Sequence, residues 1–178
     1  MEENYLRSKH LIFKLVQEND ASFILELRKN TELNKYLSST EISEDQQKEW
    51  IRKYKKREKK KEEFYFRIEK KNGEKLGFVR IYNIDYNEKT FTWGSWIIKE
   101  ERPKYSAIES ALIIYEFAFL VIGMEKAVFE VMKENIGVLG FHKRFGAIKV
   151  DEDEINEYFE IPKQEYLKLK NKNYLEFI

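Results

Sequence analysis

The hydrophobic pattern at the start of the chain predicts a strand followed by helices. Leu11–Val16 is rich in strand formers and predicts the first strand. Apolar residues at helical spacing then predict a helix capped by Asn19-Asp20 and a short second helix over Glu32–Leu37. A third helix should begin at Ser43, because Gln46 three residues later completes a capping box.

Strand-forming residues dominate the middle of the chain. Three segments have this composition: Glu63–Ile68, Leu76–Ile84 and Phe91–Ile98. The Asn72-Gly73 pair between the first two is a strong hairpin signal. Sequential strands joined by short turns predict an antiparallel meander.

From Ser106 the hydrophobic period becomes helical again. The helix that begins there is apolar over most of its girth, which predicts burial against a sheet, and Gly123 ends it. Ala127–Val131 predicts a strand that can lie parallel to the preceding one, because a helix separates the two. A helix from Asn135 to Gly146 should follow. The last predicted elements are a hairpin over 147–150 and 158–161 and a helix over 164–170.

Composition narrows the class of protein. Hydrophobic residues make up 42% of the chain and aromatic residues 15%, which indicates a globular domain. The net charge of +1 argues against a dedicated nucleic-acid binder. The chain has no cysteine and only two histidines, His10 and His142, so we expect no metal site. No signal peptide or membrane-spanning run is apparent, and we expect a cytoplasmic protein without a membrane partner.

A turn and a helix start lie together at Arg102-Pro-Lys-Tyr-Ser-Ala107. A turn that opens directly into a helix presents free backbone N–H groups and the positive end of the helix dipole. Phosphate groups bind readily at such positions. The segment therefore predicts a phosphate-bearing ligand beside the carboxyl end of a strand.

The order of elements, together with two motifs, resembles the GNAT acyl-CoA N-acyltransferases. The family's pyrophosphate turn reads Gln/Arg-x-x-Gly-x-Gly/Ala, and the chain matches it at Arg102 and Ala107. Tyr105 stands where glycine, which permits a positive φ and close backbone approach, is usual. The family's later motif, which begins with Asn and ends in Gly-Phe, is kept at Asn135 and Gly146. The resemblance extends over residues 11–161 and implies a single domain, residues 1–178, of α/β (mixed α+β) class. Its central twisted sheet, mixed but mostly antiparallel, should have about six or seven strands, with helices on both faces.

The resemblance also implies acetyl-CoA as co-substrate. Backbone amides around Ile97 and Ile98 would pair with the pantetheine arm like an added strand. The turn at 102–108 would hold the pyrophosphate, and Lys143 or Arg144 could meet the 3′-phosphate. The residues implied for the cofactor are Ile97, Ile98, Arg102, Lys104, Tyr105, Ser106, Ala107, Ile108, Asn135, Phe141, Lys143 and Arg144.

The reaction of the family is attack by a neutral amine on the acetyl thioester. His142 stands where the family has the tyrosine that protonates the leaving thiolate, although it could equally be a packed core histidine. Glu109 and Ser95 are candidates for the base, and Glu109 could instead be a carboxylate favoured by the helix dipole. The residues expected to meet the acceptor are Arg28, Tyr82, Asn83 and Trp93.

Several segments of the chain also show a looser similarity to the N-acetyltransferases that modify nucleotide-linked amino sugars for flagellin or surface polysaccharide. These segments include Arg80-Ile-Tyr-Asn83 and Trp93-Gly-Ser-Trp96. The expected partner is therefore a small-molecule amine, and a homodimer is possible. Two alternatives stay open: a ribosomal-protein type of N-terminal or lysine acetyltransferase, and a binding module whose catalytic site has lapsed.

Overall fold

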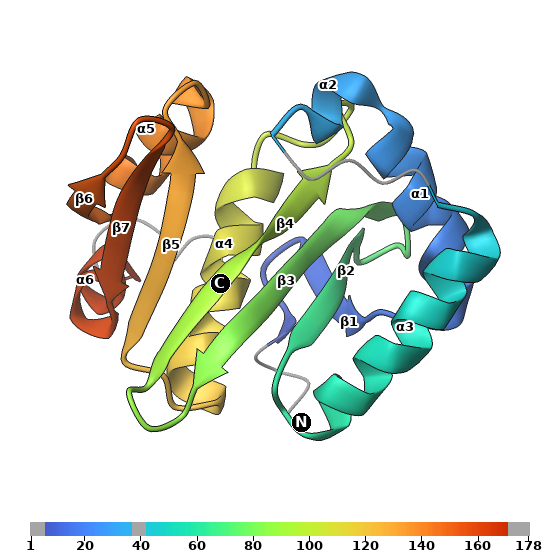
Figure 1. The fold of residues 1–178 in the computed structure, drawn as a ribbon, viewed down its shortest axis with the longest axis horizontal. Helices are drawn as coiled ribbons and strands as arrows, with labels where there is room; N and C mark the ends of the chain where they lie inside the picture. Colours follow the sequence, from blue (N-terminus) through green and yellow to red (C-terminus); the bar gives the residue numbers. More distant parts are fainter. Residues whose placement is uncertain (1–5, 37–41, 171–178) are drawn as a thin grey trace.

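One mixed sheet organises the chain, and Figure 1 shows it in a computed structural model that describes residues 6–36 and 42–170. The strands of this seven-stranded sheet lie in the order β1-β2-β3-β4-β5-β7-β6. Their bounds are β1 Leu11–Leu15, β2 Phe64–Lys70, β3 Lys75–Asp85, β4 Thr90–Ile98, β5 Lys126–Met132, β6 Ile148–Glu152 and β7 Asn156–Pro162. The predicted meander of β2, β3 and β4 is confirmed, and so is the parallel pairing of β5 with β4.

The helices agree with the predicted order, and their bounds are α1 Ala21–Lys29, α2 Thr31–Asn34, α3 Glu44–Lys59, α4 Ser106–Glu116, α5 Ile136–Arg144 and α6 Lys163–Leu169. The capping box at the start of α3 is confirmed, with Ser43 and Gln46 bonding each other's backbone amides. The short helix α2 ends earlier than predicted, and Leu37 lies outside the described residues. A π-helical turn, Phe117–Val121, continues α4. No described helix has the length and apolar character to cross a membrane.

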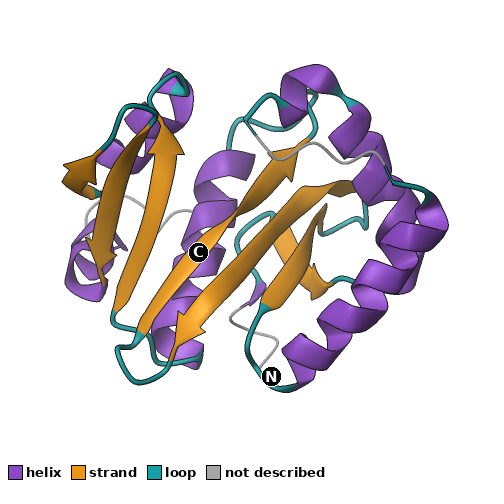
Figure 2. Cartoon of the chain, viewed as in Figure 1, coloured by secondary structure: helices purple, strands orange, loops and turns teal. Residues whose placement is uncertain are grey.

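Helices cover both faces of the sheet, as predicted (Figures 1 and 2). Alternation along β2 produces this arrangement, because Phe64 and Phe66 pack in the core with α4 whereas Tyr65 packs in the core with α1 and α3. The first core is the larger and extends to α5 and α6. Full burial of each large apolar side chain contributes roughly 1.5–3 kcal/mol, so both faces stabilise the sheet.

The sheet opens between β4 and β5. These strands pair only at their first residues, Thr90 with Lys126 and Phe91 with Ala127. Beyond that point β4 stays paired with β3, whereas β5 stays paired with β7 along its whole length. The two halves of the sheet therefore diverge toward the carboxyl ends of β4 and β5 (Figure 1).

A β-bulge lies in β4 where the strands diverge. Gly94 is opposite Arg80 and Ile97 is opposite Phe78, so β4 has one residue more than β3 in this interval. Ser95 within the bulge has a φ of 47°, a left-handed conformation that is uncommon for residues other than glycine. The bulge bends β4 and changes the direction of its side chains beside the opening.

Candidate active site

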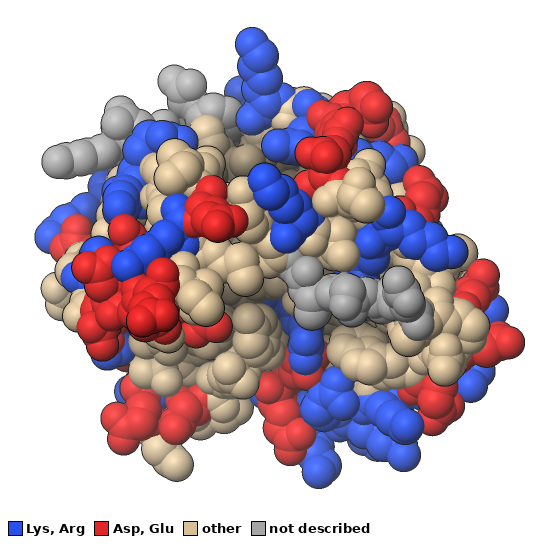
Figure 3. Space-filling view, turned by 45° about the horizontal axis from the view of Figure 1, so that its top comes forward, with Lys and Arg blue, Asp and Glu red and all other residues tan. Residues whose placement is uncertain are grey.

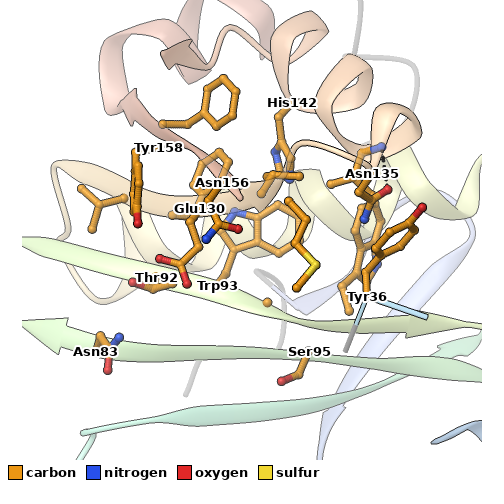
Figure 4. Close-up of a pocket in the computed structure, with 18 of the residues that line it drawn as sticks. Tyr36, Asn83, Thr92, Trp93, Ser95, Glu130, Asn135, His142, Asn156 and Tyr158 are labelled. Atoms are coloured by element: carbon orange, nitrogen blue, oxygen red, sulfur yellow. Dashed lines mark hydrogen bonds between the residues drawn. The ribbon is translucent and has the colours of Figure 1, made fainter. Parts of the chain in front are cut away.

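A cleft occupies the opening between β4 and β5, with a volume of about 660 Å³. Its lining comes from the separated parts of these strands, from β3 and β7, and from α2, α5 and adjacent residues. The space-filling view shows mainly uncharged side chains in a hollow that is flanked by charged ones (Figure 3). The close-up in Figure 4 shows polar side chains entering the cleft from several elements.

The cleft has two sides, because the open sheet has two faces. Phe91, Trp93 and Phe129 belong to the core on the α4 face. Strand alternation then directs Thr92 and Glu130 to the opposite face, where α1 and α3 pack. A ligand in the cleft can therefore be contacted from both faces of the sheet.

The start of α4 satisfies the geometry expected of an anion site. Its N-cap residue, Tyr105, provides no side-chain cap. The Ser106 amide donates to the Pro103 carbonyl at 3.0 Å, whereas within the described chain we find no hydrogen-bond acceptor for the Ala107 and Ile108 amides. The buried Ser106 hydroxyl also has no partner among the described residues. Free amides at the positive end of an eleven-residue helix can hold a diphosphate.

Tyr105 does not need the conformational freedom of the glycine that is usual at its position. Its φ of −71° and ψ of −18° are ordinary right-handed helical values. The turn therefore forms at Tyr105 without a positive φ. The Tyr105 ring instead stacks on His10, with ring centroids 4.2 Å apart, which ties the turn to the segment before β1.

Glu109 lies away from the cleft, and this corrects its interpretation as the base. Its side chain is fully buried, and one carboxylate oxygen accepts hydrogen bonds from the Ser8 hydroxyl and from the His10 amide, the latter at 3.0 Å. The other oxygen lies 2.5 Å from His10 Nδ1. The carboxylate thus joins α4 to the segment that leads into β1, a structural role.

His142 lies in the cleft wall but is buried. Its ring packs against Trp93, Phe129 and Phe141, with the Phe129 centroid 4.4 Å away. Burial lowers the pKa of His142 to about 4, so the ring is neutral near pH 7. The argument for proton donation from an ordinary histidine pKa therefore fails. Its buried Nδ1 has no hydrogen-bond partner in the described chain.

The edge of β4 offers backbone groups to the cleft. Lys99 donates its amide to the Leu76 carbonyl at 2.9 Å, so alternation directs the Ile97 backbone toward β3 and that of Ile98 toward the open edge. The Trp96 indole N–H beside them is buried without a partner among the described residues. The Trp93 indole is satisfied, since it donates to the Tyr115 hydroxyl at 3.0 Å. Trp93 therefore forms cleft wall.

Ser95, Tyr82 and Asn83 also line the cleft. Burial raises the pKa of Tyr82, and the nearby Arg80 charge opposes that rise. Asn83 has a φ of 49° at a second irregularity, between β3 and β4. Tyr36 closes one part of the rim, because its hydroxyl donates to the Glu134 carbonyl at 3.2 Å.

The remaining cofactor candidates lie around the cleft or on the surface. Asn135 lines it and caps α5 by accepting the Val138 amide at 3.3 Å. Phe141 packs on Trp96. Lys143 pairs with Glu157 at 3.1 Å. Residues 102, 104 and 144 are exposed, and Arg102 donates to the Lys99 carbonyl at 3.1 Å.

Neither Arg28, expected to meet the acceptor, nor the basic end of α3 lines the cleft. Arg28 is half-buried on α1. Some cations near the end of α3 are paired with acids: Lys55 with Glu58 at 2.6 Å and Arg57 with Glu63 at 2.7 Å. Such pairs are typical of a charged helical face.

Sequence reasoning did not identify Glu130 and Tyr158 in the cleft wall. They lie opposite each other on β5 and β7, and both line the cleft. A signal exists in the sequence, since Glu130 interrupts the otherwise apolar strand Ala127–Val131. Among the described residues we find no cluster of three or more potential metal ligands.

Comparisons with known proteins agree on one family. A family model described as an acetyltransferase (GNAT) domain matches residues 10–148. A structure described as apo FdhC, a nucleotide-linked sugar GNAT, is 44% identical to the chain and covers 97% of each chain with a TM-score of 0.89.

More distant structures show the fold alone. The spermidine N-acetyltransferase from Vibrio cholerae, solved with CoA and spermine, is 20% identical, covering 88% of this chain and 98% of its own with a TM-score of 0.74. A probable acetyltransferase is 18% identical over 88% of this chain and 95% of its own, with a TM-score of 0.77. No curated protein sequence was found to match.

Proposed function

This chain belongs to the GNAT family of acetyltransferases, and we propose that it acetylates a primary amine of an amino sugar carried on a nucleotide. Acetyl-CoA is the acyl donor, as in the family. The observation that carries the proposed acceptor is the similarity to FdhC, a nucleotide-linked sugar GNAT, at 44% identity over nearly the full length of both chains. We treat residues 1–178 as one catalytic domain that acts in the cytoplasm, and a homodimer stays a prediction.

The proposed position of acetyl-CoA follows the open edge of β4. Its diphosphate would bind the free amides at the start of α4, around Ala107 and Ile108. Its pantetheine arm would pair with the outward-facing backbone of Ile98. Phe141 and the Asn135 end of α5 would cover the other side. Arg144 is the better candidate for the 3′-phosphate, since Lys143 is already paired with Glu157.

The proposed chemistry is direct attack within a ternary complex. The neutral amine attacks the thioester carbonyl, the C–N bond forms and the C–S bond breaks. A hydrogen-bond donor at the β4 bulge would stabilise the negative charge that builds on the carbonyl oxygen, and the unpaired Trp96 indole lies in that region. His142 would contribute as a neutral hydrogen-bonding group beside the leaving sulfur, since its lowered pKa leaves little imidazolium near pH 7.

A panel of acceptors tests this proposal. Wild-type protein and acetyl-CoA are incubated with nucleoside-diphosphate amino sugars that carry free amines at different ring positions, and the release of CoA thiol is measured. The matched comparisons are the same amino sugars without the nucleotide, peptides with free N-termini or lysines, and spermidine. We expect kcat/KM to be at least about 100-fold higher for one nucleotide-linked sugar, because binding energy from the nucleotide positions the amine.

Two other results would replace this proposal. A preference for peptides would favour protein acetylation. Binding of acetyl-CoA without turnover of any amine would favour a binding module. The absence of a side-chain cap on α4 and the open cleft support acetyl-CoA binding, which both interpretations require, so turnover decides between them.

A further inference from the structure

The charge on the cleft wall has one sign. The described residues that line it include two carboxylates, Glu130 and Glu160, but no lysine or arginine. Glu160 is paired with Lys126 at 2.7 Å. For Glu130 we find no ion pair or hydrogen bond within the described chain. An amine acceptor enters as a cation at neutral pH, so this wall attracts it and Glu130 is the carboxylate left to receive it.

Glu130 also lies as far along β5 as the bulge lies along β4. It lies three residues beyond Ala127, just as Gly94 lies three residues beyond its partner Phe91. Gly94 directly precedes Ser95, the bulge residue of β4. Glu130 therefore lies across the cleft from the β4 bulge, on the same face of the sheet as Thr92, near the position of the thioester under the proposed function.

The exposed Glu130 side chain lies among polar groups of the open cleft. Tyr158 lies opposite it on β7, and Thr92 shares its face of the sheet with Tyr82. Figure 4 shows Glu130 close to Tyr158 and Thr92, with His142 entering from the other side of the cleft. Burial raises the pKa of Tyr82, and the hydrogen bond to Asp153 raises that of Tyr158; the Glu130 charge adds to both rises, so the carboxylate is within electrostatic reach of each ring.

We propose that Glu130 is the general base that binds the acceptor ammonium and removes its proton. This rests on the proposed function. The Glu130 carboxylate accepts one proton from R–NH₃⁺, and the resulting R–NH₂ attacks the acetyl carbonyl. As the tetrahedral intermediate collapses, the C–S bond breaks and a second proton moves from nitrogen to the thiolate. The products are the amide and CoA–SH, and Glu130 then releases its proton to solvent.

The pH dependence of a substitution separates a base from a structural residue. Other titratable groups line the same cleft: Tyr36, Tyr82, His142, Tyr158 and Glu160. Arg80, Asp153 and Lys126 contact Tyr82, Tyr158 and Glu160 respectively. These groups are common to wild type and variant, so the ratio of the two rates isolates the effect of Glu130.

The test compares Glu130→Gln, Glu130→Asp and wild type on the best acceptor of the panel. We expect Glu130→Gln to lower kcat/KM by about 100-fold or more near pH 7, with acetyl-CoA affinity by calorimetry within about twofold. The deficit should shrink as pH rises toward about 10, because more of the amine is already neutral. Glu130→Asp should recover part of the rate, and Glu154→Gln in the exposed β6–β7 turn is the matched control.

Three outcomes overturn the assignment. A loss that is the same at every pH would make Glu130 a structural or binding residue only, and an unchanged rate would exclude any role. Both leave the proposed function intact, since the wild type still turns over. Failure of the wild type on every amine would overturn the proposed function, and the role of Glu130 with it.

Discussion

The His142 side chain links the cleft to the acid stability of the protein. Burial lowers its pKa from 6.5 to about 4, so the folded state binds this proton less readily than the unfolded state. The free energy of unfolding therefore keeps its full value above about pH 6.5, and it falls as the pH decreases toward 4 because the unfolded state takes up the proton first. By linkage, going from pH 7.5 to pH 5 should cost about 2 kcal/mol through this residue alone.

Substitution of His142 by Phe should remove that part of the pH dependence. Urea unfolding of wild type and His142→Phe at pH 7.5 and pH 5 measures it, and the variant should lose about 2 kcal/mol less than wild type over this interval. Comparing each protein with itself cancels any packing change. Equal losses would show that the ring is already solvated in the folded state.

For several single residues, the sequence predicted the position but not the environment. The family motif was enough to single out His142 as a site residue. Its burial and neutral state could not be predicted, because they depend on Trp93 and Phe129, which are distant in sequence. The shape of the turn at Tyr105 could not be predicted from a motif that has glycine there. Glu130 is a solvent-exposed strand residue, and only the opening of the sheet places it in the cleft wall.

At the scale of elements, the periodic signals were sufficient for most of the fold. The capping box at Ser43 and the apolar girth of the helix after Ser106 both predicted the observed elements. The π-helical turn at Phe117–Val121 was missed because its apolar spacing continues that of α4. The bulge at Ser95 was missed because it depends on the register between β3 and β4.

Gly77 controls the contact between β3 and β4. A Cβ there would fall on the carbonyl oxygen of Ile97, which is backbone and cannot rotate away. We expect Gly77→Ala to destabilise the fold by about 3 kcal/mol, and to displace the edge of β4 proposed to hold the pantetheine arm. Urea unfolding and acetyl-CoA affinity measure the two effects.

Gly137 in α5 is the matched control for this substitution. A Cβ at that position meets nothing within 4 Å, and alanine is the better helix former. Gly137→Ala should leave stability unchanged or raise it by up to about 1 kcal/mol. If the two alanine variants were equally stable, the strand packing described here would be incorrect.

At the scale of the whole molecule, the cleft separates the sheet into two halves. β4 and β5 share only the pairs at Thr90 and Phe91, so backbone hydrogen bonds contribute little to joining the two halves. The joint depends on the core around α4, whose members come from both sides. A ligand that spans the start of α4, the edge of β4 and α5 would therefore add contacts between halves that are otherwise weakly connected.

Acetyl-CoA should consequently stabilise the protein and protect a limited set of amides. At a concentration of about 100 times its Kd, binding adds about 2.7 kcal/mol, which raises the Tm of a chain of this size by roughly 5–10 °C. Hydrogen exchange should slow at Ile98, Ala107 and Ile108, while the amides between β2 and β3 remain unchanged because their hydrogen bonds exist without ligand. Differential scanning fluorimetry and exchange mass spectrometry measure these effects. A rise in Tm without slower exchange at Ala107 and Ile108 would show that the diphosphate binds elsewhere. A diphosphate at the start of α4 would accept hydrogen bonds from these two amides and protect them.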